Sequence, residues 1–353
     1  MLHPKLTRRD FLKLAGLSLT SLAFRPQLSR PFQGSGDDLD FNRLIRITTE
    51  TVSVYSEPSD KSRILYQRTR DELVNVYAEV ISDDGPGYNP LWYRVWGGYI
   101  HSAYTEPVKV QLNTVLTNPD PAGVLSEVSV PFTQAYLPNN KTTWDPIYRL
   151  YYTSTHWITG VIEGPDGEPW YKLKDELLEI EYAVPAVHMR VIQPDELTPL
   201  SPEVPAQKKR IEVSLARQEL TAYEEDRVVL HTKIASGLPD KRKPAPGLIL
   251  TETPVGEFHV QSKMPSKHMG DGNITSDIYA YELPGVPWTS FFVPETGVAF
   301  HGTYWHTNYG ITMSHGCINM KPEEAKWIFR WCTPVTDEKT IEKRGYGTLV
   351  IVS

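Results

Sequence analysis

Proline is frequent in this chain and limits what it can fold into. The 353 residues include 29 prolines and 19 tyrosines. Proline breaks the interior of a helix, whereas tyrosine and other aromatic residues favour strands. We therefore expect a mainly β protein built from short strands and turns. A chain of this length is expected to form two or three domains.

The overall charge argues against one class of partner. The net charge is −7 at neutral pH, with 43 acidic residues against 36 lysines and arginines. Proteins that bind nucleic acids usually present an excess of positive charge, so we expect no nucleic acid partner. No apolar run reaches the roughly 18 residues that a membrane-spanning helix needs.

The N-terminal residues predict export. Residues 7–13 (TRRDFLK) have the twin-arginine pattern and precede a short apolar stretch, residues 14–24. An amphipathic helix is the alternative. We predict a signal segment over residues 1–30 and a tether over residues 31–42. The protein is then expected in the periplasm, the cell wall or the extracellular space, with membrane contact only through an uncleaved signal.

Two β-rich modules are predicted to follow. Residues 43–108 contain short alternating segments between turns, and the order VYSEPS, WYRV, GYI resembles the bacterial SH3-like domains of exported cell-wall proteins. In residues 109–193, the segments 136–140 and 168–173 echo the first module, which predicts a degenerate second copy. Aromatic side chains of both modules could bind glycan strands. The alternative is that they fill the cores.

Four prolines between residues 194 and 207 predict a semi-rigid linker before a last domain, residues 208–353. Within that domain, residues 264–272 and 284–289 are expected to be long irregular loops that shape a substrate cleft. The expected strands lie at residues 209–223 (two strands around a polar turn), 228–235, 253–261 and 347–353.

One helix is expected, over residues 322–332, and it contains one of the two cysteines. Pro322 suits the first helical position, and two glutamates occupy the first turn. The apolar residues of the segment recur at helical spacing and include Cys332, which is therefore expected in the core. A disulfide is then disfavoured, and Cys317 is left as a free thiol.

Cys317 lies in the segment with the most distinctive chemistry, SHGCIN (residues 314–319), sixteen positions after His301-Gly302. A neighbouring imidazole lowers the pKa of a thiol and accepts its proton, so we predict a cysteine nucleophile with a histidine base. The alternatives are a structural histidine at a strand end, or a metal site. The metal alternative has no Cys-x-x-Cys or His-Glu-x-x-His spacing to support it, so we predict no metal.

This segment resembles the L,D-transpeptidase catalytic domain (YkuD). The segments IEVSLARQELTAY and TPVGEF and the closing GTLVIV agree with the family over residues 208–352. The resemblance implies a YkuD-type β-sandwich with one or two short helices, preceded by one or two small SH3-like β-barrels. It implies acyl exchange on peptidoglycan stem peptides, with stem peptides and glycan strands as partners and no cofactor.

The resemblance also implies roles for individual residues. Cys317 would form a thioester with the stem peptide, and His301 would take and return the proton. His315 would line the site. The backbone N–H groups of His315, Gly316 and Cys317 would form the oxyanion hole.

Further positions in and around the motif have expected supporting roles. Gly302 stands where some relatives have serine, so a backbone carbonyl is expected to orient His301. Ser314 is expected to brace the loop, and Asn319 occupies a family position. His268 is expected on the surface rather than in catalysis, and His306 either contacts substrate or faces solvent. The candidate substrate contacts are His306, Tyr304, Trp305, Met264, His268 and Trp288.

Two other functions remain open at this stage. In an L,D-carboxypeptidase, water would replace the acceptor amine, and the choice would depend on the shape of the cleft. A catalytically silent wall-binding protein is the other alternative, which an intact cysteine–histidine pair disfavours.

Overall fold

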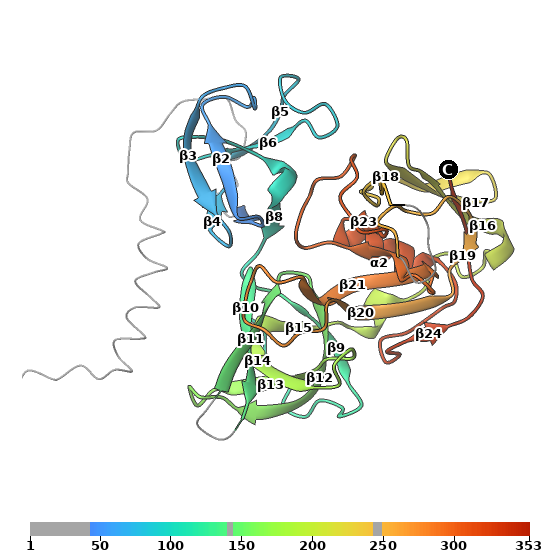
Figure 1. Cartoon of the computed structure of the whole chain (residues 1–353). Helices are drawn as coiled ribbons and strands as arrows, with labels where there is room; N and C mark the ends of the chain where they lie inside the picture. The colour runs from blue at the N-terminus through green and yellow to red at the C-terminus, as the bar shows by residue number, and fades with distance from the viewer. Residues whose placement is uncertain (1–42, 140–143, 243–248) are drawn as a thin grey trace, which may run out of the picture. The chain divides into compact units, whose positions relative to one another are not determined.

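The computed structural model describes residues 43–139, 144–242 and 249–353, which are mainly β (Figure 1). The predicted signal and tether fall before residue 43, outside the described residues. None of the helices in these three ranges is long and apolar enough to cross a membrane.

The first module forms two small sheets around one hydrophobic core. In its second strand every other residue, Val52 and Val54, is buried, which is the period of a half-buried strand. The sheets have the strand orders β4-β1-β8 and β3-β2-β7-β6-β5. A compact β module is thus present, and its likeness to SH3-like domains stays a prediction. The strands are β1 (Leu44–Ile47), β2 (Thr51–Tyr55), β3 (Ile64–Thr69), β4 (Leu73–Asn75), β5 (Ala78–Ile81), β6 (Leu91–Val95), β7 (Gly98–His101) and β8 (Thr105–Val108).

The second module is a single antiparallel sheet of seven strands with the order β11-β10-β14-β13-β12-β9-β15. It has its own core. This strand order differs from that of the first module, so it does not support a degenerate second copy. The strands are β9 (Val124–Val128), β10 (Phe132–Pro138), β11 (Trp144–Tyr151), β12 (Thr155–Glu163), β13 (Pro169–Lys174), β14 (Glu181–Pro185) and β15 (Met189–Val191).

The large aromatic side chains of the two modules are divided between core and surface. Trp92, Trp157 and Trp170 are buried, which favours the core alternative for them. Trp96, in the turn between β6 and β7, is 71% exposed. Only an exposed aromatic side chain such as Trp96 is available to bind a glycan strand.

The proline-rich segment packs against the last domain and is not a free linker. It contains the 3₁₀ turns Pro194–Leu197 and Ala206–Lys208. Leu197 is buried in the hydrophobic core of the last domain. Glu196 binds Arg190 and Lys326, both at 2.7 Å. The prolines prevent a regular ladder, as expected, but they do not prevent packing.

The last domain consists of two five-stranded sheets and one helix around a common core. The first sheet has the order β18-β17-β16-β25-β19, and the second has the order β23-β22-β21-β20-β24. The core draws residues from both sheets and from the helix, among them Ile211, Phe292 and Ile328. The elements are β16 (Lys209–Ser214), β17 (Glu219–Glu224), β18 (Arg227–Lys233), β19 (Gly256–His259), β20 (Ser262–Gly270), β21 (Glu282–Val293), β22 (Val298–Gly302), β23 (Ile318–Met320), α2 (Pro322–Trp331), β24 (Lys343–Arg344) and β25 (Leu349–Val352).

The two stretches expected to be irregular loops belong mostly to strands. Residues 264–270 continue β20, and residues 284–289 lie within β21. The two strands pair with a register shift between Lys267 and Met269. Beyond Lys263, β20 pairs with β21 alone, so Pro265 does not interrupt a ladder on the other edge. The prolines led to a prediction of loops, but the structure has a bulged hairpin of β20 and β21 in their place.

Helix α2 confirms the predicted helix and the position of its cysteine. Pro322 occupies the first turn, and Cys332 is fully buried with a free thiol. Two buried lysines close the C-terminal end of α2. Lys263 donates to the Cys332 carbonyl at 2.9 Å, and Lys209 donates to the Trp331 carbonyl at 3.1 Å. Cations are favoured there because the carbonyl end of a helix is partly negative.

Substituting Gly302 by alanine should separate β22 from α2. An added Cβ would lie 2.8 Å from Pro322 Cα, a backbone atom that cannot move alone. We expect Gly302→Ala to lower the free energy of unfolding by about 1–3 kcal/mol, measured by urea denaturation. Gly87→Ala is the control, because its Cβ would meet nothing within 4 Å. Equal losses in the two variants would contradict the prediction.

Candidate active site

The two ends of the motif meet on neighbouring strands. Strands β22 and β23 pair in parallel, with Phe300 opposite Ile318 and His301 opposite Asn319. Cys317 comes directly before β23, beside Ala299, whose backbone N–H its sulfur accepts. His301 is two residues further along β22, or about 6.6 Å along the strand. The pairing thus brings together two residues that are sixteen positions apart.

His301 is held in one tautomer by the backbone. Its ring is buried, and Nδ1 lies 3.0 Å from the Gly302 carbonyl oxygen. A carbonyl only accepts hydrogen bonds, so Nδ1 carries the proton and Nε2 keeps its lone pair. This confirms that a backbone carbonyl orients the histidine. Burial lowers the pKa of His301 to about 4, so the ring is neutral at pH 7.

The Cys317 thiol is also neutral. Its sulfur donates to the Gly297 carbonyl at 3.5 Å. Burial raises the thiol pKa to about 11, although the hydrogen bond from Ala299 opposes the shift. The expectation that the neighbouring imidazole lowers the thiol pKa is therefore wrong for this state. The pair is a thiol and a neutral base, which can react when the base removes the proton as the sulfur attacks.

The turn before the cysteine is braced by Ser314. Its hydroxyl donates to the Cys317 carbonyl at 2.6 Å and accepts from Gly316 N–H at 3.1 Å. Gly316 has a φ of +120°, which requires glycine. Because its N–H already binds Ser314, Gly316 is a poor oxyanion donor in this state. The N–H groups of His315 and Cys317 remain as the candidates.

His306 lies beneath the site and neither faces solvent nor reaches the surface. It is buried, and its Nδ1 accepts from Asn308 N–H at 3.2 Å. Its Nε2 therefore carries the proton and can donate to the Asn319 side-chain amide, 2.9 Å away, when that amide presents Oδ1, which has no other hydrogen-bond partner. Burial, with His301 nearby, lowers the pKa of His306 to about 3. Asn319 and His306 thus join the loop after His301 to β23 and have a supporting position.

His315 is the exposed histidine of the motif. Its ring lies 5.4 Å from the ring of Tyr281, at the start of the β21 region. Tyr281 is half-exposed, and partial burial, with Cys317 and Asp271 nearby, raises its pKa. The sequence analysis missed Tyr281. It is far from the motif along the chain, and only the unexpected β20–β21 hairpin brings it near.

Most of the candidate substrate contacts are buried. Met264 and Trp288 are core residues, and the Trp288 ring packs 5.6 Å from that of Phe329. Tyr304 is also buried, so these three are corrected from substrate contacts to structural residues. Trp305 is half-buried, and its ring lies 5.7 Å from that of His301. It is the remaining candidate of this group beside the site.

His268 is buried, which corrects the expectation that it lies on the surface. Its Nδ1 lies 2.7 Å from Asp175 of the second module, and its Nε2 lies 3.1 Å from Glu282 of β21. Burial alone would lower its pKa, but these two carboxylates outweigh burial and raise it. His268 therefore joins the second module to the catalytic sheet.

Over the described ranges, no three or more His, Cys, Asp or Glu side chains are grouped so as to hold a metal ion. In the metal alternative, His301, His306, His315 and Cys317 would be the ligands, but the His306 ring already contacts Asn308 and Asn319.

A cysteine thiol near a neutral histidine on a β-sandwich is the arrangement of a candidate cysteine-nucleophile site. A comparison with protein families matches the domain that contains it. Residues 208–352 match the model of YkuD, the L,D-transpeptidase catalytic domain. This part of the chain is an L,D-transpeptidase catalytic domain of the YkuD family. L,D-transpeptidase 1 of Mycobacterium tuberculosis is 36% identical over 87 residues, which cover 22% of this chain and 32% of that protein. The match therefore spans about a third of the relative's length.

Solved structures of L,D-transpeptidases are also similar to parts of the chain. A mutant of the Enterococcus faecium enzyme is 28% identical and covers 42% of this chain and 50% of that one, with a TM-score of 0.29. LdtMt1 in complex with imipenem is 17% identical and covers 69% of this chain and 99% of that one, with a TM-score of 0.31. Both scores are below 0.5, so the superpositions add nothing to the family assignment.

The Cys317 thiol should depend on His301 for its reactivity. Because the thiol is neutral at pH 7, a base must assist its deprotonation. We expect His301→Ala to slow alkylation of Cys317 by iodoacetamide near pH 7.5 by about tenfold or more. Mass spectrometry of the labelled peptide measures the rate. Cys332→Ser is the control and should leave the rate unchanged, because Cys332 is fully buried. Equal rates in all three proteins would show that the two residues are not coupled.

The contribution of His268 to stability should depend on pH. Its folded-state pKa lies above the unfolded value, so its stabilisation is complete below pH 6.5 and is lost as the pH rises through the folded pKa. We expect His268→Gln to lower Tm more at pH 6 than at pH 9. The exposed His231 provides the control variant His231→Gln. A Tm difference that is constant between the two pH values would contradict the prediction.

Proposed function

We propose that this protein is a peptidoglycan L,D-transpeptidase. It transfers an acyl group from a stem tetrapeptide, through a Cys317 thioester, to an amine acceptor. The observation that carries the proposal is the placement of Cys317 directly before β23, next to strand β22 with His301, whose Nε2 keeps its lone pair. The family of residues 208–352 supports the same reaction class.

Acylation would proceed through one proton transfer in each direction. His301 Nε2 takes the thiol proton as Cys317 Sγ attacks the carbonyl carbon at the L-centre of the stem peptide. The N–H groups of His315 and Cys317 donate to the oxyanion. The peptide C–N bond then breaks, and His301 returns the proton to the amine of the leaving D-amino acid.

In deacylation the acceptor amine would be the nucleophile and the Cys317 thiolate the leaving group. The acceptor amine attacks the thioester carbonyl carbon and gives its proton to His301. The C–S bond breaks, and the Cys317 thiolate recovers the proton from His301. A new amide bond between two stem peptides is the product, and the enzyme returns to its starting state.

We also propose export by the twin-arginine route, with peptidoglycan stem peptides and glycan strands as partners. Residues 7–13 (TRRDFLK) support the route. The proposed substrate supports it as well, because peptidoglycan is assembled outside the cytoplasm.

The proposal predicts a covalent adduct on one cysteine. Incubation with a tetrapeptide-containing muropeptide should give an acyl adduct on Cys317 or cross-linked dimers, detected by mass spectrometry. Cys317→Ala should abolish both products, and Cys332→Ser should retain them. Release of the D-amino acid without dimers would identify water as the acceptor and a carboxypeptidase. A folded wild-type protein that forms neither adduct nor product would overturn the enzyme proposal.

A further inference from the structure

Arg46 of the first module lies at the meeting point of three parts of the chain. Its side chain is 2% exposed and donates to Glu106 at 2.7 Å and to Asp71 at 2.9 Å. A third hydrogen bond of 2.7 Å runs to the backbone carbonyl of Tyr304, in the loop after His301. The guanidinium also lies 4.0 Å from the ring centre of Tyr151, in the second module.

Tyr304 connects Arg46 to the proposed base. Its ring stacks on Tyr151 at 5.8 Å, and its hydroxyl donates to the Pro284 carbonyl at 3.0 Å. The next residue, Trp305, packs its ring against Tyr304 at 4.9 Å and against His301 at 5.7 Å. The position of the His301 ring therefore depends on where Tyr304 is held.

The first module contacts the same loop at a second place. Thr307 N–H donates to the Ala103 carbonyl at 3.0 Å, and its hydroxyl donates to the Ser102 carbonyl at 2.6 Å. Gly310 approaches Tyr88 so closely that a Cβ would stand 3.0 Å from the Tyr88 carbonyl oxygen. The loop of residues 303–310 is thus bound at both of its ends.

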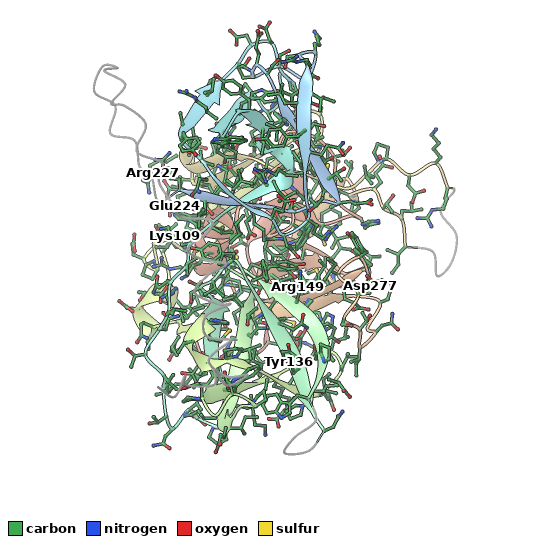
Figure 2. All side chains as sticks on the ribbon, turned by 90° about the vertical axis from the view of Figure 1, so that its left-hand side faces the viewer. Lys109, Tyr136, Arg149, Glu224, Arg227 and Asp277 are labelled. Atoms are coloured by element: carbon green, nitrogen blue, oxygen red, sulfur yellow. The ribbon has the colours of Figure 1, made fainter. Side chains whose placement is uncertain are left out.

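The second module completes the arrangement around Asp71. Arg149 of β11 binds the other carboxylate oxygen of Asp71 at 2.6 Å. Arg149 and Asp277 line one small cavity and lie near each other in Figure 2. Arg70, next to Asp71, donates to the Ile278 carbonyl at 3.2 Å. Both modules therefore contact the segment that leads to Tyr281.

We propose that Arg46 is a positioning residue for the acyl-transfer site, through which the first module sets the placement of His301. This inference rests on the proposed roles of Cys317 and His301. An arginine is required because its planar fork reaches Glu106, Asp71 and the Tyr304 carbonyl together. A lysine has a single nitrogen and cannot reach all three in that geometry.

The test compares Arg46→Lys with the wild type in the full-length protein. We expect kcat for dimer formation from a tetrapeptide-containing muropeptide to fall about tenfold or more, with KM changed less than twofold. The rate of Cys317 alkylation by iodoacetamide at pH 7.5 should fall in parallel. Arg94→Lys, at an exposed arginine of the same module, is the matched control and should change neither rate.

A second control separates positioning from stability. Ile100→Val removes a methyl group from the core of the first module and lowers its stability without altering a hydrogen bond. If Ile100→Val reduced alkylation as much as Arg46→Lys at equal loss of Tm, the role would be structural and the inference would fail. It would fail also if Arg46→Lys left both rates unchanged.

A milder variant covers the case in which Arg46→Lys does not fold. Thr307→Val deletes the hydroxyl bond to the Ser102 carbonyl and preserves the shape of the side chain. It should slow alkylation several-fold, and an unchanged rate would overturn the inference. The alkylation assay needs no peptidoglycan. A wild type that forms no muropeptide product would therefore sink the proposed function and leave the test of Arg46 intact.

Discussion

The parallel pairing of β22 with β23 is the constraint on which the rest of the site depends. Two strands can pair in parallel only if the chain between them returns to the starting edge, and here residues 303–317 make that return. A slip of one residue would move Cys317 away from Ala299 and turn His301 or Asn319 to the opposite face. The register is therefore fixed by packing on both sides: Phe300 and Ile318 fill the core, and Asn319 meets His306.

The first module meets the last domain through polar contacts, whereas the second module also shares the apolar core of the last domain through Leu125, Trp157 and Ile192. Arg46 meets Glu106 and Asp71 in the interior, and His268 meets Asp175 and Glu282. A buried charge that loses its partner is costly, so neither cluster can open without leaving a carboxylate unpaired. Such polar contacts between modules specify one arrangement more than they add to the free energy of unfolding. They define how the modules join, and in the first cluster burial raises the pKa of Glu106 while Arg46 opposes the rise.

Local sequence patterns predicted the strands and the helix, which depend on neighbouring residues. The features that they did not predict depend on contacts between residues that are distant in sequence. The alternation in residues 209–223 and the apolar stripe of α2 identified elements that form as expected, and Cys332 was correctly placed in the core. Pro265 and Pro287 suggested loops, because sequence does not reveal which edge of a strand lacks a partner. His268 and His306 were expected to be accessible, but contacts outside their own segments hold both in the interior: His268 meets Asp175, 93 positions away, and His306 meets Asn319, 13 positions away. Tyr281 gave no local signal at all.

The neutral state of Cys317 also bears on how the protein survives where we expect it to work. Oxidants and disulfides react with thiolates far faster than with thiols. A thiol that donates a hydrogen bond to the Gly297 carbonyl, and whose pKa burial raises to about 11, presents almost no thiolate at neutral pH. The proposed nucleophile would therefore be protected from sulfenic acid formation and from mixed disulfides until the proposed stem-peptide substrate binds. The protecting contact is the hydrogen bond from the thiol to the Gly297 carbonyl, which a bound substrate can replace.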